Sequence, residues 1–304
     1  MKKSLIALAV LAAAGAASAQ SSVQLYGIAD LSLVKDKGAA TQMLSGAVSG
    51  SRFGVKGSED LGGGLKANFV LEQGFDASNG AADVAGQAFE REASVGVSGA
   101  FGAVKVGRAG TAFDDVVGAT NPVFDSALSP TGVFQGYTGR TSNGVYYTSP
   151  SYAGFTAGVS YAFAEGLAAK NVTAYNVQYA NGPIAAAFAQ QDDDVAAAKF
   201  TRLNGSYDLG VVKLLGAYGR VKANATGDKT NEYSIGADVP LASNLVLSAG
   251  YAASKADGEE RASSVSVGVA YLLSKRTTVY GGLRNDNDNG PVDSRVAVGV
   301  KHAF

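Results

Sequence analysis

The feature that most constrains this chain is a two-residue alternation of apolar and small or polar side chains, which recurs along almost its whole length. In segment 65–72 the odd positions are Leu, Ala, Phe and Leu, whereas Lys66, Asn68 and Glu72 occupy the other phase. Segment 295–304 alternates in the same way. Because successive side chains of a β-strand point to opposite faces, the pattern predicts strands with one apolar and one polar face.

The alternating segments are joined by short turns and by longer polar loops, and these two kinds of connection tend to alternate along the chain. An even number of strands of roughly ten residues, joined in this manner, is typical of an outer-membrane barrel. We therefore predict an all-β fold, a transmembrane antiparallel β-barrel of 16 strands. The expected strands are 23–33, 48–57, 64–74, 89–98, 102–108, 140–149, 155–163, 171–180, 183–191, 198–207, 211–221, 230–239, 245–254, 261–271, 277–285 and 292–304.

The composition of the second strand face favours a barrel over a secreted soluble sandwich, which is the alternative. That face is mostly Gly, Ala, Ser and Thr, and charged residues make up 17% of the chain, below the ~25% of ordinary soluble domains. In lipid an unpaired backbone group is costly, so a spanning sheet has to close on itself. Tyrosines near strand ends fit the aromatic girdles of such a barrel, namely Tyr26, Tyr147, Tyr161, Tyr179, Tyr207, Tyr251 and Tyr271.

Residues 1–19 have the composition of a secretory signal peptide. Lys2 and Lys3 precede an apolar run over 5–14, and Ala17-Ser18-Ala19 forms a cleavage signal. The run is shorter than the ~20 apolar residues of a membrane anchor. We therefore expect cleavage after Ala19 and a single barrel domain over 20–304. Loss of the two lysines takes the net charge from −1 to −3.

The remaining composition excludes several classes of function. A net charge of −1 provides no basic surface for nucleic acid. The chain has no cysteine and one histidine, so it lacks the ligands of thiolate or multi-histidine metal sites. His302 shares the outward apolar phase with Phe304, away from the wet cleft that a catalytic base requires. We expect no metal, no cofactor and no enzymatic activity.

Several segments resemble, in order and spacing, the general diffusion porins of Gram-negative bacteria, in particular the neisserial and burkholderial branch. The longest is Gly57-Ser-Glu-Asp-Leu-Gly-Gly-Gly-Leu-Lys-Ala-Asn-Phe-Val-Leu-Glu72. The others are 21–27, 101–108, 143–150, 273–277 and 300–304. The resemblance spans the mature chain and implies a sixteen-stranded, water-filled, trimeric barrel whose third extracellular loop folds inward.

Segment Ala109–Gly139 is by far the longest connection and is the candidate for that loop. An inward fold explains its apolar residues Phe113, Val117, Phe124 and Phe134, which can dock against a wall; a disordered surface loop is the alternative. The loop also carries Asp114, Asp115 and Asp125. In the family it resembles, such carboxylates face a ladder of arginines on the opposite barrel wall.

Arg52 and Arg140 fit that ladder by strand phase, because each shares the inward phase with small residues. Arg91 matches the family position, yet strict alternation places it with the apolar Val95 and Val97. Either a bulge turns Arg91 into the lumen, or Glu90 and Glu92 occupy the lumen there. The predicted pore constriction is thus Arg52, Arg91, Arg140, Asp114, Asp115 and Asp125, with Lys56, Glu72 and Lys105 on the lumen wall.

These observations predict a porin in the outer membrane of a Gram-negative bacterium, a channel for passive diffusion of small hydrophilic solutes and ions. Two charges ~10 Å apart across water interact by only about 0.4 kcal/mol, which favours a sieve over a receptor. A substrate-specific channel or a surface adhesin on the same barrel is the alternative. The expected partners are two further copies in a homotrimer, outer-membrane lipid and lipopolysaccharide. The acidic residues 192–194 and 259–260 lie in predicted surface loops, where we expect them to be solvated; divalent-ion bridging to lipopolysaccharide phosphates is the alternative. The arginines favour anions and the net charge favours cations; we expect a slight preference for anions.

Overall fold

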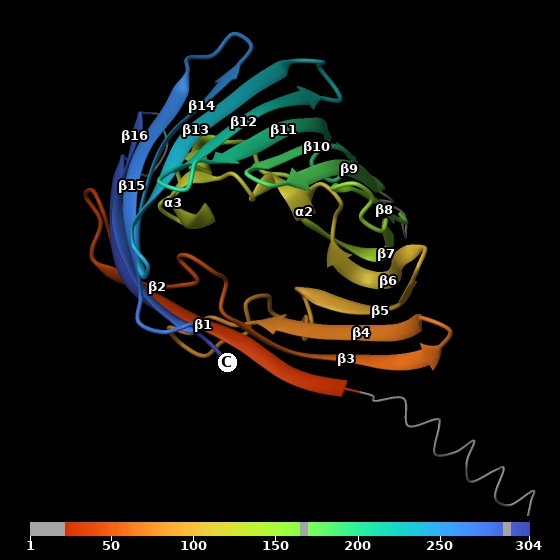
Figure 1. Cartoon of the computed structure of the whole chain (residues 1–304). Coiled ribbons are helices and arrows are strands. Elements are labelled where there is room, and N and C mark those ends of the chain that lie inside the picture. The colour runs from red at the N-terminus through yellow and green to blue at the C-terminus, as the bar shows by residue number, and fades with distance from the viewer. Residues whose placement is uncertain (1–21, 165–169, 288–292) are drawn as a thin grey trace, which may run out of the picture.

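In the computed structural model, which describes residues 22–164, 170–287 and 293–304, the chain forms one antiparallel sheet that closes into a barrel (Figure 1). The expected signal peptide lies outside the described residues. The strands are β1 (Ser22–Asp36), β2 (Gln42–Ser45), β3 (Arg52–Gly62), β4 (Leu65–Gly74), β5 (Glu92–Gly99), β6 (Gly102–Gly110), β7 (Arg140–Thr148), β8 (Phe155–Ala162), β9 (Val172–Asn181), β10 (Ile184–Asp193), β11 (Ala198–Asp208), β12 (Lys213–Ala223), β13 (Lys229–Ala242), β14 (Leu245–Ala256), β15 (Ala262–Leu272), β16 (Thr277–Asn287) and β17 (Ser294–Ala303).

The barrel is closed by the pairing of its first and last strands. Residues Ile28 to Asp36 of β1 lie opposite Ala303 to Arg295 of β17. On its other side β1 pairs with β3 near its start and with the short β2 near its end. β2 and β3 therefore act as one wall strand interrupted by a bend at 46–51, and the wall has the sixteen strands that the alternation predicts. The gap between the expected strands 23–33 and 48–57 predicts a loop over 34–47. This is wrong for 34–36, which belong to β1, and for 42–45, which pair with β1 as β2.

Exposure follows the alternation along the wall strands. In β17, Val296, Val298 and Val300 are 57%, 54% and 45% exposed, whereas Ala297 between them is 2% exposed. The exposed apolar side chains lie on the outer face, and the inner face carries buried polar residues such as Asp30 and Ser32. A soluble sandwich would bury its apolar face in a core, so this pattern confirms the barrel.

The tyrosines divide between the two faces. Tyr147, Tyr161, Tyr207 and Tyr271 are exposed among apolar residues of the outer face, where an aromatic girdle is expected. Tyr26 does not belong to this group, because its phase in β1 is opposite to that of the exposed Val23 and Leu25 and its hydroxyl donates to the inward Glu72. The assignment of Tyr26 to the girdle is therefore wrong.

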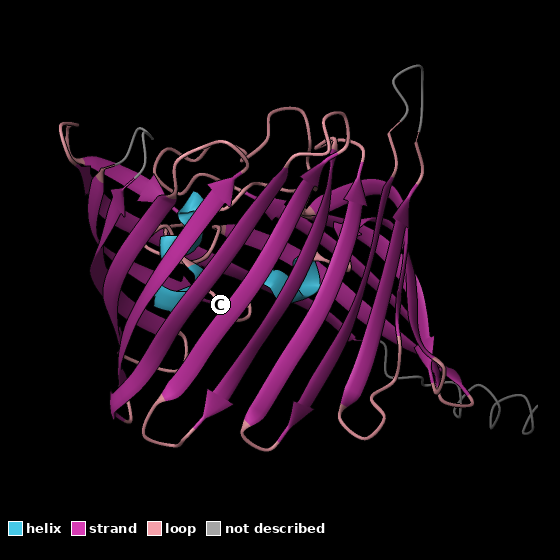
Figure 2. Cartoon of the chain, turned by 90° about the horizontal axis from the view of Figure 1, so that it is seen from above, coloured by secondary structure: helices cyan, strands magenta, loops and turns pink. Residues whose placement is uncertain are grey.

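The long connection between β6 and β7 lies inside the barrel outline (Figure 2). It holds three one-turn segments, α2 (Asp114–Val117), α3 (Pro122–Asp125) and the 3-10 turn η1 (Pro130–Val133). Within the described ranges, no helix is long and apolar enough to cross a membrane. The largest buried apolar cluster lies between this loop and the inner wall, where Phe113, Val116 and Val117 pack on Ala174, Ala189 and Phe200.

Candidate functional site

The inner face of β3 to β5 carries a group of charges centred on Glu72. Arg91 Nε lies 2.7 Å from Glu72 Oε1, and Arg52 Nε lies 3.9 Å from Glu72 Oε2. The Tyr26 hydroxyl donates to the same carboxylate at 2.9 Å. Tyr26 and Glu72 are on strands that flank β3, and both lie opposite Gly54. A Cβ at Gly54 would be 2.8 Å from the Tyr26 hydroxyl, so this glycine allows the contact across the strand.

The two interpretations of Arg91 do not exclude each other in the structure. β5 begins at Glu92, three residues later than expected, so Arg91 lies in a bend where strand alternation does not apply. Its side chain contacts the inward Glu72. Glu92 also lies on the inner face, and Glu90 is buried with one oxygen accepting the backbone N–H of Gly74.

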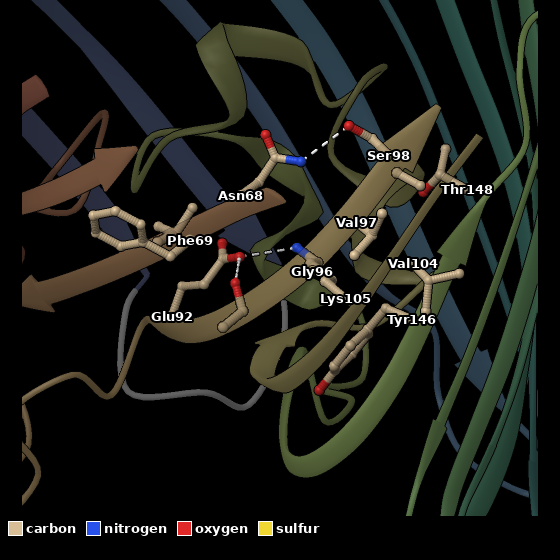
Figure 3. A pocket seen from close by; sticks show the side chains of 13 residues that line it. Asn68, Phe69, Glu92, Gly96, Val97, Ser98, Val104, Lys105, Tyr146 and Thr148 are labelled. Carbon is tan, nitrogen blue, oxygen red and sulfur yellow. Dashed lines mark hydrogen bonds and ion pairs between the residues drawn. The ribbon is translucent and has the colours of Figure 1, made fainter. Parts of the chain in front are cut away.

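A second tier of polar residues lies nearer the short-turn end of the same wall (Figure 3). Lys105 Nζ is 3.0 Å from Glu92 Oε1 and 5.7 Å from the centre of the Tyr146 ring. Lys56 Nζ is 4.9 Å from the centre of the Tyr26 ring. Lys56, Glu72 and Lys105, the three residues expected on the lumen wall, therefore all lie on the inner face.

The opposite part of the wall holds the loop through side chains that bond to its backbone. Asn176 Nδ2 and Asn204 Nδ2 each donate at 2.6 Å to loop carbonyl oxygens, those of Ala112 and Val116. Ser248 Oγ accepts the backbone N–H of Val123 at 2.8 Å. These inward side chains therefore form hydrogen bonds with backbone N–H and C=O groups of the loop that would otherwise be unpaired.

Arg202 and Glu232 form a buried ion pair behind the loop, 2.9 Å apart and with side chains 7% and 1% exposed. They lie on β11 and β13 and face each other across Gly219 of β12. A Cβ there would be 2.9 Å from Arg202 Nε and 3.1 Å from Glu232 Oε2. Glu232 also accepts the backbone N–H of Gln135 at 2.6 Å, so the pair fixes the second half of the loop.

The tip of the loop sits on a stretch of wall without side chains. A Cβ on Gly250 would be 2.3 Å from Pro122 Cβ, one on Gly236 would be 2.5 Å from Pro122 Cγ, and one on Gly268 would be 2.6 Å from Val123 Cγ1. Val123 and Phe124 have φ of 55° and 64°, a conformation that costs non-glycine residues free energy. The close fit on the glycines and the bond to Ser248 offset that cost.

The bend at 46–51 contacts both the loop, near Ala127, and the side chain of Arg91. Asp30, fully buried, accepts the backbone N–H groups of Val48 at 2.9 Å and Ser49 at 2.6 Å, and it also accepts the Tyr280 hydroxyl. From this bend, Ala47 accepts the backbone N–H of Ala127 at 2.6 Å. A Cβ on Gly50 would be 3.1 Å from Arg91 Nη1.

The expected constriction residues form two groups rather than one opposed pair of rows. Arg52 and Arg91 belong to the β3–β5 wall, whereas Arg140, the first residue of β7, lines a recess of the loop. Asp114 and Asp125 line the same recess, and both accept hydrogen bonds from loop side chains, Tyr137 at 2.8 Å and Asn121 at 2.6 Å. Arg140 and Arg91 are still near enough to Arg52 to repel its charge.

Two of the loop carboxyls, Asp115 and Asp125, ionise less readily than free ones. The Asp115 side chain is exposed, but the surrounding protein raises its pKa to about 6 by desolvation, and nearby Asp114 and Glu92 add to the effect. Desolvation also raises the pKa of Asp125, against the hydrogen bond from Asn121. The loop side is therefore negative at neutral pH and loses charge under mildly acidic conditions.

The alternation alone does not predict the Arg202–Glu232 pair or the bend held by Asp30. A signal for the pair was present, since both charged residues occupy the inward phase of correctly predicted strands. The inward Arg284 and Arg295 show the same signal, and they pair with Asp286 at 2.7 Å and Asp36 at 2.7 Å. Asp30 shows this signal too, as an inward charge of the expected strand 23–33, but the bend itself has none, because β2 has only four residues.

Comparisons with known proteins agree on one family. Residues 5–291 match the family model described as Gram-negative porin. The chain is 36% identical to outer membrane porin protein 32 of Delftia acidovorans and 34% identical to an outer membrane porin protein of Bordetella pertussis, in each case over 100% of both chains.

Solved structures show the same fold. An anion-selective porin from Comamonas acidovorans superposes with a TM-score of 0.80 at 29% identity, over 93% of this chain and 100% of that one. The trimer form of OmpT, an outer membrane protein of Vibrio cholerae, superposes with a TM-score of 0.75 at 19% identity, over 93% and 99%. With its closed sixteen-stranded barrel, the chain belongs to the Gram-negative porin family.

Proposed function

We propose that this outer-membrane porin passes small hydrophilic solutes and ions through a lumen narrowed between the Arg52–Arg91 group and the loop of residues 111–139, with a slight preference for anions. The observation that carries the proposal is the unequal charge of the two sides. On the β3–β5 wall and the adjoining β6, four cations, Arg52, Arg91, Lys56 and Lys105, accompany two lumenal carboxylates, Glu72 and Glu92.

The loop side has the opposite sign, with Asp114, Asp115 and Asp125 against Arg140. Charges fixed on facing walls of low dielectric create a field across the opening, which orients polar solutes and biases the passage of ions. Each pair is weak in water, so the arrangement filters solutes without retaining them. The anion-selective relative supports the direction of the preference.

Planar bilayers test this function. We expect large ohmic single-channel currents that no sugar or organic anion saturates, and a reversal potential in a KCl gradient that reports faster chloride passage. Arg52→Ser combined with Arg140→Ser should move the reversal potential toward the equilibrium potential of potassium. Saturation by one solute would instead identify a substrate-specific channel, and an unchanged reversal potential would remove both arginines from the constriction.

We also infer a homotrimer and a mature chain that begins at Gln20. The trimer form of a structurally similar outer membrane protein supports the first inference, and the cleavage signal at 17–19 supports the second. Native electrophoresis in mild detergent and the intact mass of the outer-membrane protein test them. A monomer, or a mass that includes residues 1–19, would contradict the respective inference. Porins are channels, and no catalytic role is proposed for His302.

A further inference from the structure

The outer face of β11 to β14 changes in character toward the end of the barrel that bears the long loops. Leu203, Tyr218 and Tyr233 lie side by side in one row across β11, β12 and β13. The next row toward the loops is Thr201, Arg220, Asn231 and Lys255, and the row after it is Lys199, Lys222 and Lys229. An apolar and tyrosine surface therefore gives way to cations within four residues.

The cations of these rows are only partly neutralised by their neighbours, of which Asp257 accepts the backbone N–H of Lys229 at 3.0 Å through Oδ2. Lys222 lies directly opposite Lys199 on one side and Lys229 on the other, an arrangement that destabilises a sheet. Asp192 pairs with Lys199 at 3.0 Å, but no salt bridge within 4.0 Å joins Lys222 or Lys229 to a described carboxylate.

Arg220 is held in place by uncharged partners. Its Nε is 3.2 Å from Asn231 Oδ1 and its Nη2 is 3.1 Å from the Tyr218 hydroxyl, which itself donates to Asn231. The guanidinium is thereby oriented while its charge stays available. We call Arg220, Lys222, Lys229 and Lys255 the basic patch.

The patch has the size and the depth of a lipid headgroup. Neighbouring strands are ~4.8 Å apart and residues two apart along a strand ~6.8 Å apart, so four cations lie within about 10 by 7 Å. Tyrosines of membrane barrels mark the interface between hydrocarbon and headgroups. Cations one and two rows beyond Tyr218 and Tyr233 therefore lie at headgroup level, where basic clusters attract anionic lipid.

The neighbouring strands β9 and β10 lack this charge at the same level. On β9 and β10 the outward residues are Thr173, Tyr175, Gln190 and Asp192, which line a recess together with Asp194. That surface is neutral to acidic. The patch is therefore a feature of one face and not of a uniform basic ring around the rim.

We propose that the basic patch binds the phosphate groups of a phosphorylated glycolipid in the outer leaflet, directly and without a bridging metal ion. The proposal rests on the outer-membrane location of the barrel, and it differs from a cation bridge to the acidic loop residues 192–194 and 259–260. Phosphate supplies the multivalent anion that a row of like charges requires. The tyrosine row below supplies a surface for the sugar and the start of the acyl chains.

The experiment uses the full barrel in detergent, with EDTA present, and native mass spectrometry to count bound lipid. The probes are diphosphoryl lipid A, its dephosphorylated form and inorganic phosphate. The variant is K222Q/K229Q/K255Q, and a matched control, K35Q/K66Q/K275Q, removes three lysines elsewhere. We expect the variant to weaken binding of diphosphoryl lipid A on the order of 100-fold, about fivefold per cation, and the control to bind like the parent.

Several results would overturn the proposal: equal binding of the phosphorylated and dephosphorylated lipids, an unaffected triple variant, loss of binding in EDTA, or competition by inorganic phosphate at the same concentration as the lipid. A variant that changes oligomeric state would show that the patch is a contact between copies. Single-channel conductance of the variant should equal that of the parent, which verifies folding and keeps this test separate from that of the channel function.

Discussion

The two sides of the lumen are built from the same alternation but use their inward polar residues differently. On β3 to β5 the charged side chains Arg52, Arg91 and Glu72 are paired with one another and remain partly exposed, between 13% and 25%. On β11 and β13 the charged residues Arg202 and Glu232 are buried under the loop. The charges of the first wall are therefore available to solutes, whereas those of the second hold the loop in place.

A glycine enables the main polar contact on each side. Gly54 lets Tyr26 reach Glu72, and Gly219 lets Arg202 reach Glu232, each across an intervening strand. The difference between the walls is what lies over them, water in one case and the loop in the other. An ion pair loses most of its hydration only in the second case, so the same chemistry has different energetic consequences.

The largest effect is expected from breaking the buried pair. Arg202→Met leaves Glu232 buried without its cation, which costs about 3–5 kcal/mol, whereas Arg52→Met on the open wall should cost less than about 1 kcal/mol. Urea unfolding of the barrel in detergent micelles measures both. Arg202→Met with Glu232→Gln serves as the control, since removal of both charges should restore most of the stability. Equal costs for the two single variants would contradict the distinction between the walls.

The next largest effect is expected from the wall glycines on which the loop tip packs. Gly250→Ala places a Cβ where Pro122 now lies, so the loop must shift away from the wall and into the lumen. We expect single-channel conductance to fall and the open current to become noisier. Gly216→Ala is the matched control, because the nearest atom to its Cβ would be 3.9 Å away. A conductance equal to that of the parent would show that the loop does not narrow the pore.

The partly exposed arginines of the β3–β5 wall should change selectivity and leave stability nearly unchanged. Each charge at ~10 Å contributes about 0.4 kcal/mol, or a factor of about two in ion preference. Arg52→Ser with Arg91→Ser should therefore lower the ratio of chloride to potassium permeability by about two- to fourfold, as read from the reversal potential in a KCl gradient. Arg220→Gln on the outer face should leave the ratio unchanged. A loss of stability comparable to that of Arg202→Met would assign these arginines a structural role.

The sequence was sufficient for the wall and insufficient for the connections. The alternation specifies which residues of a strand share a face, so it placed Lys56, Glu72 and Lys105 on the inner side. It does not apply to Arg91, which precedes β5, or to the bend at 46–51, which interrupts a strand. Nearness to a strand end wrongly predicts an outward Tyr26, whereas its phase in β1 predicts the inward position that the structure shows.

Contacts between residues separated by an intervening strand could not be predicted from the sequence, for a different reason. Arg202 and Glu232 are 30 residues apart, and their meeting depends on the register of β11, β12 and β13 and on the glycine between them. Phase alone indicates that both charges face inward. Register also decides whether Arg140 lies with Arg52 or with the loop carboxylates, and the structure places it in the recess of the loop.

The smallest expected effect is a dependence of selectivity on pH that arises on the loop side alone. The pKa of Asp115 is raised to about 6, so this carboxyl is ionised at about pH 7.5 and mostly neutral at about pH 5. Protonation removes a negative charge, so chloride preference should rise by up to about twofold as the pH falls through 6. Asp125, whose pKa is also raised by desolvation, should add to the rise. Asp115→Asn should remove the step near pH 6 and hold the ratio at its acidic value, whereas a step that persists in this variant would have to come from another group. Because arginine side chains in general do not titrate in this range, a reversal potential that follows Asp115 separates the contribution of the loop from that of the arginine wall.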